Sequence, residues 1–275
     1  MVSSSQVPAA APRTAQLLSF IILLLTAAAA AGGLFLPSLY RDSAWLVTAM
    51  RGQDLYTLAV AVPALAITLL FARRGSVRSR LVLVGLLGYI LYTYTGAAFA
   101  FAFNEFFLLY VTLFSLSLAA LFALVGRMEL ADLPNRFGPA TPRRAVAIFL
   151  IVIGLMLAMA ELGQIIPFLT EGRLPLPLQL AEAPTFYPYT LDLGVVMPLC
   201  LLTGVWLWRR EPRGYLLAGV MLIKAATMGL ALLATSAYAW LTGGIVDGPD
   251  LLVGYGIIGF GGLAMSVWFF RHCRG

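Results

Sequence analysis

The sequence predicts an all-α integral membrane protein with about eight transmembrane helices. Two observations support this fold class: 61% of the 275 residues are hydrophobic, and only 11% are charged. Soluble domains carry about 25% charged residues. Together with a mean hydropathy of +0.93, this composition favours a polytopic membrane protein over a large soluble core.

Eight apolar runs are long enough to span a bilayer, which takes about 20 residues of helix. We expect a single polytopic domain over residues 1–275, with a flexible N-terminus at 1–16 and a short interfacial helix within 39–54. The segment AFNEF separates the third and fourth spans and predicts a tight helical hairpin. The expected spans are residues 17–38, 55–72, 81–101, 106–125, 145–168, 190–208, 215–239 and 250–270.

The distribution of arginines predicts the orientation of these spans. Every arginine except Arg41, Arg51 and Arg173 falls on one side of the membrane. The side richer in Lys and Arg faces the cytoplasm. An even number of spans places both termini on the same side, so we expect cytoplasmic N- and C-termini. The expected location is the cytoplasmic membrane of a bacterial cell.

The first span allows a second interpretation. Its sequence LLSFIILLLTAAAAAG joins an apolar stretch to small residues, as in a cleaved signal peptide. Cleavage would leave seven spans. An internal similarity favours retention of the first span, because it gives this span a partner in the fifth.

The two halves of the sequence, residues 17–127 and 145–271, resemble each other. GLFLPSL aligns on GQIIPFL without a gap, and the second and sixth spans each carry a proline, Pro63 and Pro198, before a closing Arg-Arg pair. We expect a 4+4 tandem repeat. Because four is an even number of spans, the two halves would have parallel orientation, as in parallel-repeat transporters.

The only lysine of the chain, Lys224, lies in the apolar run GVMLIKAATMG. With a rise of about 1.5 Å per residue, it is roughly 15 Å from Gly214, near the bilayer centre. Exposing a lysine to lipid there costs at least about 2.5–3.5 kcal/mol, so the side chain should face the bundle interior. Lys224 is therefore the leading functional candidate. The alternative is a structural cation that fixes the register of the helices.

Two carboxylates within the predicted spans are candidate partners of this lysine. Glu161 is the first expected partner and Asp192 the second, and both should lie about 9 Å nearer the outer face. Gln164 follows Glu161 by three residues and shares its helix face.

Other polar side chains complete the candidate substrate or proton pathway. Tyr92 and Ser115 lie near the level of Lys224, while Asn104 and Glu105 in the hairpin could line an outer path. The glycines of GFGG at 259–262 would allow another helix backbone to approach closely.

Several function classes receive no support from the sequence. The chain has one histidine, and we expect no metal site and no cofactor. Neither GxxxxGK[ST] nor GxGxxG occurs. The arginines lie in short clusters between apolar runs, so they indicate topology rather than nucleic-acid binding. The expected partners are the lipid bilayer and a small-molecule or ion substrate.

Three functions are compatible with these features. A small-molecule or ion-coupled permease explains the repeat, the helix prolines and the midplane charge. A lipid-modifying enzyme or a non-transporting accessory or scaffold subunit is the alternative, although no nucleophile or metal set accompanies the carboxylates. A retinal-type photoreceptor with Lys224 as the Schiff base is less favoured, because another span follows the lysine. An enzymatic role is therefore the weaker expectation.

Overall fold

A computed structural model describes residues 13–274, which are helical or irregular with no β-strand among them. The predicted flexible segment 1–16 falls mostly outside this range, and its last residues already belong to the first helix. The elements are α1 (Arg13–Phe35), α2 (Ala44–Tyr56), η1 (Thr57–Ala61), α3 (Val62–Ala72), α4 (Val77–Phe99), α5 (Phe107–Val125), η2 (Leu130–Asp132), α6 (Leu133–Arg136), α7 (Arg143–Glu171), α8 (Leu176–Ala181), α9 (Tyr187–Leu191), η3 (Asp192–Val196), α10 (Met197–Trp208), α11 (Pro212–Thr242) and α12 (Pro249–Arg271).

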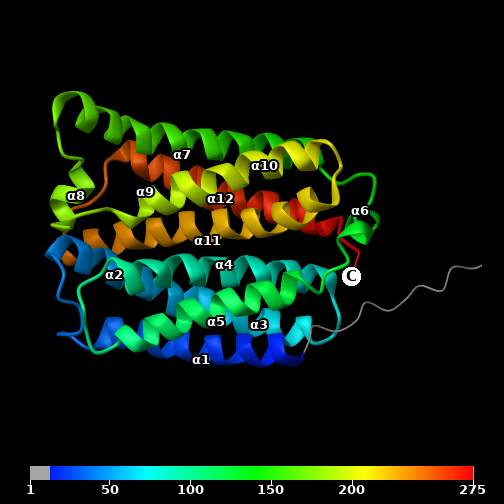
Figure 1. Cartoon of the computed structure of the whole chain (residues 1–275), viewed down its shortest axis with the longest axis horizontal. Coiled ribbons are helices and arrows are strands. Elements are labelled where there is room, and N and C mark those ends of the chain that lie inside the picture. The colour runs from blue at the N-terminus through cyan, green and yellow to red at the C-terminus, as the bar shows by residue number, and fades with distance from the viewer. Residues whose placement is uncertain (1–12, 275) are drawn as a thin grey trace, which may run out of the picture.

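Eight helices in the described residues are long and apolar enough to cross a membrane, which confirms the predicted number. The chain is thus a multi-pass membrane protein. Six spans are the single helices α1, α4, α5, α7, α11 and α12, and two are composite: α2–η1–α3 and α9–η3–α10. All eight run along the long axis of the molecule (Figure 1).

The second span is longer than the sequence predicted. It begins at Ala44 rather than near residue 55, after Ser43, whose hydroxyl caps the helix by accepting a hydrogen bond from the Leu46 N–H. The expected interfacial helix within 39–54 is therefore the first part of a spanning helix. Hydropathy missed it because its polar residues Gln53 and Asp54 face protein partners rather than lipid.

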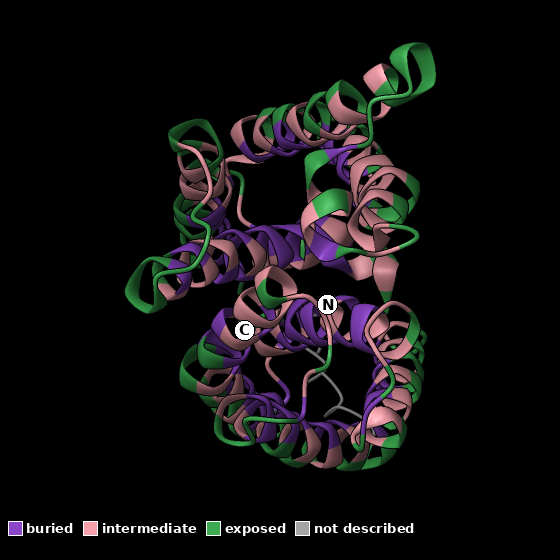
Figure 2. Cartoon of the chain, turned by 90° about the vertical axis from the view of Figure 1, so that its left-hand side faces the viewer, coloured by how far each residue is buried: buried purple, intermediate pink, exposed green. Residues whose placement is uncertain are grey.

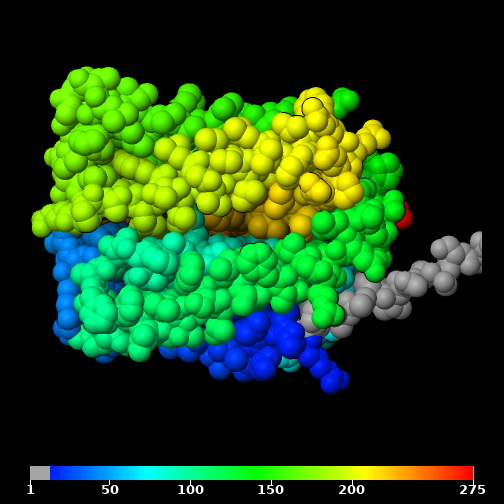
Figure 3. Space-filling view, in the orientation of Figure 1, coloured from blue at the N-terminus to red at the C-terminus, as the bar shows by residue number. Residues whose placement is uncertain are grey.

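The spans form two groups of four, one from each half of the chain. Figure 2 shows the groups as two rings of helices viewed from one end, and Figure 3 shows them as layers that meet along the length of the helices. The first half contains α1, α2–α3, α4 and α5, and the second contains α7, α9–α10, α11 and α12. Two separate clusters of buried apolar residues accompany the two groups.

Helix α11 joins the two halves, because it packs against both α2 and α4 of the first half. Small residues make this contact close. A Cβ on Gly85 would lie 2.5 Å from the Cβ of Ile223, and one on Gly52 would lie 2.5 Å from the Cα of Thr235. Glycines at such positions let membrane helices pack backbone to backbone, where van der Waals contact is the main driving force.

Both composite spans contain a π-helical turn that ends two residues before a proline. The Val62 N–H bonds to the Thr57 carbonyl, and the Met197 N–H bonds to the Asp192 carbonyl, each five residues back. Proline lacks an N–H and its ring clashes with a carbonyl of the preceding turn. A wider π turn relieves this clash, and such turns often occur at functional sites.

The two ends of the molecule differ in charge. Connections 73–76, 126–142 and 209–211 lie at the same end as Arg13 and the C-terminus, and we call this the arginine-rich end (Figure 1). Arg41, Arg51 and Arg173 lie toward the other, arginine-poor end. The charge asymmetry expected from the sequence is thus present in the arrangement of the helices.

The two halves also differ in how closely their first and last spans pack against each other. In the first half, α1 packs along α5, whereas in the second half α7 contacts α12 only sparsely. A Cβ on Gly261 of α12 would lie 2.9 Å from Phe149, toward the arginine-rich end. Farther along the same helices, a Cβ on Gly163 or Gly254 would have no atom within 4 Å. The first and last spans of the second half are therefore less closely packed against each other than those of the first half.

Candidate functional site

Lys224 lies in α11 with 8% of its surface exposed. It follows Pro212, the first residue of the helix, by twelve residues, which places it about 18 Å along the helix. Lysine is a good helix former, so the helix continues through it. The predicted burial of Lys224 inside the bundle is confirmed.

The Lys224 ammonium contacts an aromatic ring and does not form an ion pair with a carboxylate. Its Nζ lies 3.6 Å from the centroid of the Tyr92 ring on α4. A desolvated cation–π contact of this kind stabilises by about 2 kcal/mol. The ion pairs within residues 13–274 are Arg41–Glu105, Arg136–Asp132 and Arg173–Glu171, so Lys224 has no carboxylate oxygen within 4 Å.

Asp192, at the start of the π-helical turn η3, is the carboxylate that interacts electrostatically with Lys224. The Tyr92 side chain lies within interaction range of the same carboxylate. Glu161 interacts with Asp192 instead, and its Oε2 is buried without a hydrogen-bond partner among the described residues. The order of partners expected from the sequence, Glu161 before Asp192, is thus reversed in the structure.

One side of the lysine helix is covered by the backbone of α12. A Cβ on Gly262 would lie 2.6 Å from the Ala226 nitrogen, and one on Gly229 would overlap Gly259. The expectation that the GFGG glycines permit close approach is confirmed. Because α12 is so close there, the space available to the lysine side chain lies toward Tyr92 and the α9–α10 span.

Aromatic residues from both halves surround the outer side of this site. The Tyr187 ring lies 6.0 Å from Tyr92 and 5.9 Å from Phe101, measured between centroids, and a side chain on Gly96 would collide with it. Tyr187 was not among the predicted site residues, because the proline-rich segment before Asp192 was expected to be a connection. The aromatic cluster FYPY was the available signal for an ordered helix start.

The remaining predicted site residues divide between separate places. Gln164 is half-buried on α7, near Glu161, whereas Ser115 is exposed on α5 of the other half. Asn104 is buried in the hairpin, where its Oδ1 accepts the Phe106 N–H at 2.9 Å, and the exposed Glu105 pairs with Arg41. Ser115, Asn104 and Glu105 therefore do not join the Lys224 group.

The first half contains a neutral arrangement with the same sequence spacing. Thr57 begins η1 as Asp192 begins η3, and Thr57 precedes Tyr89 by 32 residues, the separation of Asp192 and Lys224. Here the two hydroxyls are hydrogen-bonded at 2.8 Å. The Gln53 Nε2 also donates to Tyr89 at 3.0 Å and to Thr93 at 3.1 Å.

The described residues contain no group of three or more His, Cys, Asp or Glu arranged to hold a metal ion. No protein-family model, curated protein or solved structure shows a match to this chain. Function is therefore inferred from the geometry of the site. A buried ammonium, an aromatic wall and a separated carboxylate can bind an anionic group or transfer charge between two positions.

Proposed function

We propose that the chain is a permease for a small anionic solute, with Lys224 as the binding group. The single observation that carries this proposal is a buried ammonium within a membrane span that lacks an ion pair. Intramembrane charges almost always pair with a partner or mark a substrate pathway. A cation that contacts an aromatic ring and has no carboxylate within ion-pair distance remains available to an incoming carboxylate or phosphate.

The separation of Asp192 from Lys224 suggests how binding and release alternate. In one state, the ammonium pairs with the anionic group of the solute. In the other, it moves toward Asp192, which compensates its charge while the solute leaves. The Tyr92 ring contacts the ammonium in the present structure and stabilises an intermediate position. Glu161, which interacts with Asp192, offers a carboxyl group that can take up a proton during the exchange.

We further propose that the halves are tandem repeats in parallel orientation, related by an axis along the membrane normal. The matching π-helical turns before Pro63 and Pro198 support this proposal, as does the shared 32-residue spacing. The arginine-rich end would face the cytoplasm of a bacterial cell, with both termini there. The charged pair is present in the second half only, which suits a function added to a duplicated scaffold.

Uptake into proteoliposomes tests the permease proposal. We expect the wild-type protein to accumulate at least one of the radiolabelled probes acetate, succinate, glutamate and inorganic phosphate. Lys224→Gln should reduce uptake of that probe at least about 100-fold, since loss of a buried ionic contact costs about 3 kcal/mol or more. Thr227→Val is the matched control, because the Thr227 hydroxyl bonds only to backbone carbonyls of its own helix, at Ile223 and Lys224.

Unchanged uptake in Lys224→Gln would refute the role of the lysine. If no probe enters with the wild-type protein while a partner subunit co-purifies in fixed ratio, the accessory-subunit alternative would be favoured instead.

A further inference from the structure

A second polar cluster lies inside the first half, near the arginine-poor end. Asp54 of α2 is 6% exposed, and the Tyr40 hydroxyl donates a hydrogen bond to its Oδ2 at 2.5 Å. The cluster belongs to a different half of the molecule from Lys224, and it lies beside Asn104, which was expected to line an outer path. A buried carboxyl group within a membrane span is costly to keep and marks a functional site by default.

On the α1 side, the cluster is bounded by the backbone of a glycine, Gly33. A Cβ on Gly33 would overlap both the Asp54 carboxylate and the Tyr40 hydroxyl. The glycine therefore lets α1 close over the hydrogen-bonded pair without a side chain between them. Gly163, its counterpart in the sequence alignment of the two halves, has nothing within 4 Å.

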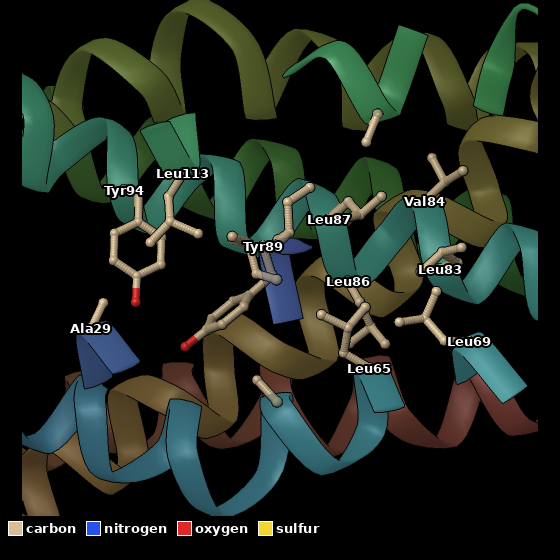
Figure 4. Packing of buried hydrophobic residues seen from close by; sticks show 14 of the residues in the cluster. Ala29, Leu65, Leu69, Leu83, Val84, Leu86, Leu87, Tyr89, Tyr94 and Leu113 are labelled. Carbon is tan, nitrogen blue, oxygen red and sulfur yellow. The ribbon is translucent and has the colours of Figure 1, made fainter. Parts of the chain in front are cut away.

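Another wall of the cluster carries a hydroxyl group that lacks a partner. Tyr94 and Tyr110 stack at 5.9 Å with an interplanar angle of 24°, and they are 3% and 2% exposed. The Tyr94 hydroxyl has no hydrogen-bond partner among the described residues, whereas the Tyr110 hydroxyl lies within interaction range of Tyr40 and Asn104. Figure 4 shows the Tyr94 hydroxyl directed away from α4 toward Ala29 of α1. Buried polar groups are normally paired, so the unpaired Tyr94 hydroxyl requires an explanation.

The titratable groups around Asp54 come from each neighbouring element. Tyr40 lies in the connection after α1, Tyr89 and Tyr94 on α4, and Tyr110 on α5, and each interacts electrostatically with the carboxyl group. On its own helix, Arg51 interacts at longer range. The Arg51 Nη2 donates to the Pro37 carbonyl at 3.1 Å and forms no ion pair with Asp54.

A second carboxylate, Asp42, lies at the edge of the cluster. The Asp42 carboxylate accepts the Ala102 N–H at 2.8 Å, and the backbone of Gly33 on α1 faces Asp54. Burial, followed by the charge of Asp54, raises the pKa of the Tyr40 phenol far above its usual range. Tyr40 therefore remains a hydrogen-bond donor at neutral pH.

We infer that Asp54 is a proton-binding site that exchanges a proton with the aqueous phase at the arginine-poor end. In the unprotonated state, the carboxylate accepts the Tyr40 hydroxyl. On protonation, Oδ1 or Oδ2 gains the proton and becomes a donor, and the Tyr94 hydroxyl oxygen, which otherwise lacks a partner, accepts the hydrogen bond. The unpaired Tyr94 hydroxyl is thus explained as a partner of the protonated state. This inference stands without the proposed transport function.

Infrared difference spectroscopy of the full chain in lipid vesicles tests the site during a pH titration. Protonation of Asp54 should produce a carboxylic-acid C=O band that Asp54→Asn removes and that Asp192→Asn and Glu161→Gln retain. Tyr40→Phe should raise the midpoint of this band by about one pH unit or more, because it removes a hydrogen bond that stabilises the charged carboxylate. Gly33→Ala should also shift it, whereas Gly163→Ala should leave it unchanged.

The titration is repeated in sodium chloride and in choline chloride, because a cation could occupy the same oxygens. Equal midpoints in both salts support a proton site, and a midpoint that moves with sodium concentration would overturn it. The inference also fails if the band persists in Asp54→Asn or if Tyr40→Phe and Gly33→Ala both titrate like the wild-type protein. Should Asp54→Asn not fold, the two latter variants decide the outcome alone.

Discussion

In the first half of the chain, Thr57 and Tyr89 are joined by a 2.8 Å hydrogen bond, whereas Asp192 and Lys224, with the same 32-residue spacing, form no ion pair within 4 Å. Both pairs lie between the composite span of their half and the helix that follows it. The neutral pair has its polar groups satisfied and holds two helices together. The charged pair is left apart, which is the condition under which a buried charge can accept a ligand.

The packing of the helices around the two pairs also differs. In the first half α1 packs against α5, whereas in the second half α7 and α12 make few contacts with each other. Regions with few packed contacts open at low free-energy cost, and moving elements are drawn from them. The comparison indicates that the first half is the more tightly packed part of the molecule.

The largest loss of stability should follow from separating α12 from α11, because α12 packs mainly against α11. Gly229→Val adds a side chain whose Cβ would lie 2.5 Å from the Gly259 Cα. Overpacking of this kind costs about 3 kcal/mol when the contact is made by backbone. Thermal unfolding followed by circular dichroism should show a strong loss of stability. Gly254→Val, on α12 with nothing within 4 Å, is the control and should unfold like the wild-type protein.

A smaller effect is expected when the neutral pair of the first half is broken. Thr57→Val removes the hydroxyl that bonds to Tyr89 and should lower the free energy of unfolding by about 0.6 kcal/mol, the mean for such bonds in membranes. Thr203→Val in the second half is the matched control, because the buried Thr203 hydroxyl has no partner among the described residues. Denaturant titration should find the control neutral or stabilised. Equal destabilisation of both variants would contradict the structural role of the Thr57 bond.

The smallest effect concerns the connector between the halves, residues 126–142. Arg136 donates to Asp132 at 2.7 Å, and this hydrogen bond lowers the pKa of the Asp132 carboxyl group. A lowered folded-state pKa contributes stability above the unfolded-state value and loses it as the pH falls below about 4. Both side chains are only half-buried and screened by solvent, so the contribution of the pair should stay below about 0.5 kcal/mol. Asp132→Asn should therefore differ slightly from the wild-type protein at pH 7 and not at pH 3, as measured by thermal unfolding, with Glu129→Gln as the control.

The number of spans was predictable because hydropathy and length determine which segments can cross a bilayer. The early start of the second span at Ala44 was not, because a hydropathy window counts Gln53 and Asp54 as polar whether they face water or protein. The burial of Lys224 also followed from its depth. The residues around Lys224 could not be predicted in this way, because the rise per residue gives the level of a residue along a helix but not the direction of its side chain.

Several residues show this limitation. Ser115 has the expected level but faces outward from α5, while Tyr92 has the same level and contacts the lysine. Asp192 is the electrostatic neighbour of Lys224 from within a π-helical turn, which helical periodicity does not predict. The Tyr40–Asp54 pair joins residues 14 positions apart across a connection and depends on the absence of a side chain at Gly33.

The central claim, that the charged pair serves transport while the neutral pair serves structure, is tested most directly by exchanging one for the other. The double variant Asp192→Thr/Lys224→Tyr gives the second half the neutral pair of the first. We expect it to fold with a free energy of unfolding at least equal to that of the wild-type protein, because replacing buried ions by neutral groups is often stabilising. Uptake of the transported probe into proteoliposomes should be abolished. Uptake at the wild-type rate by this folded double variant would contradict the account.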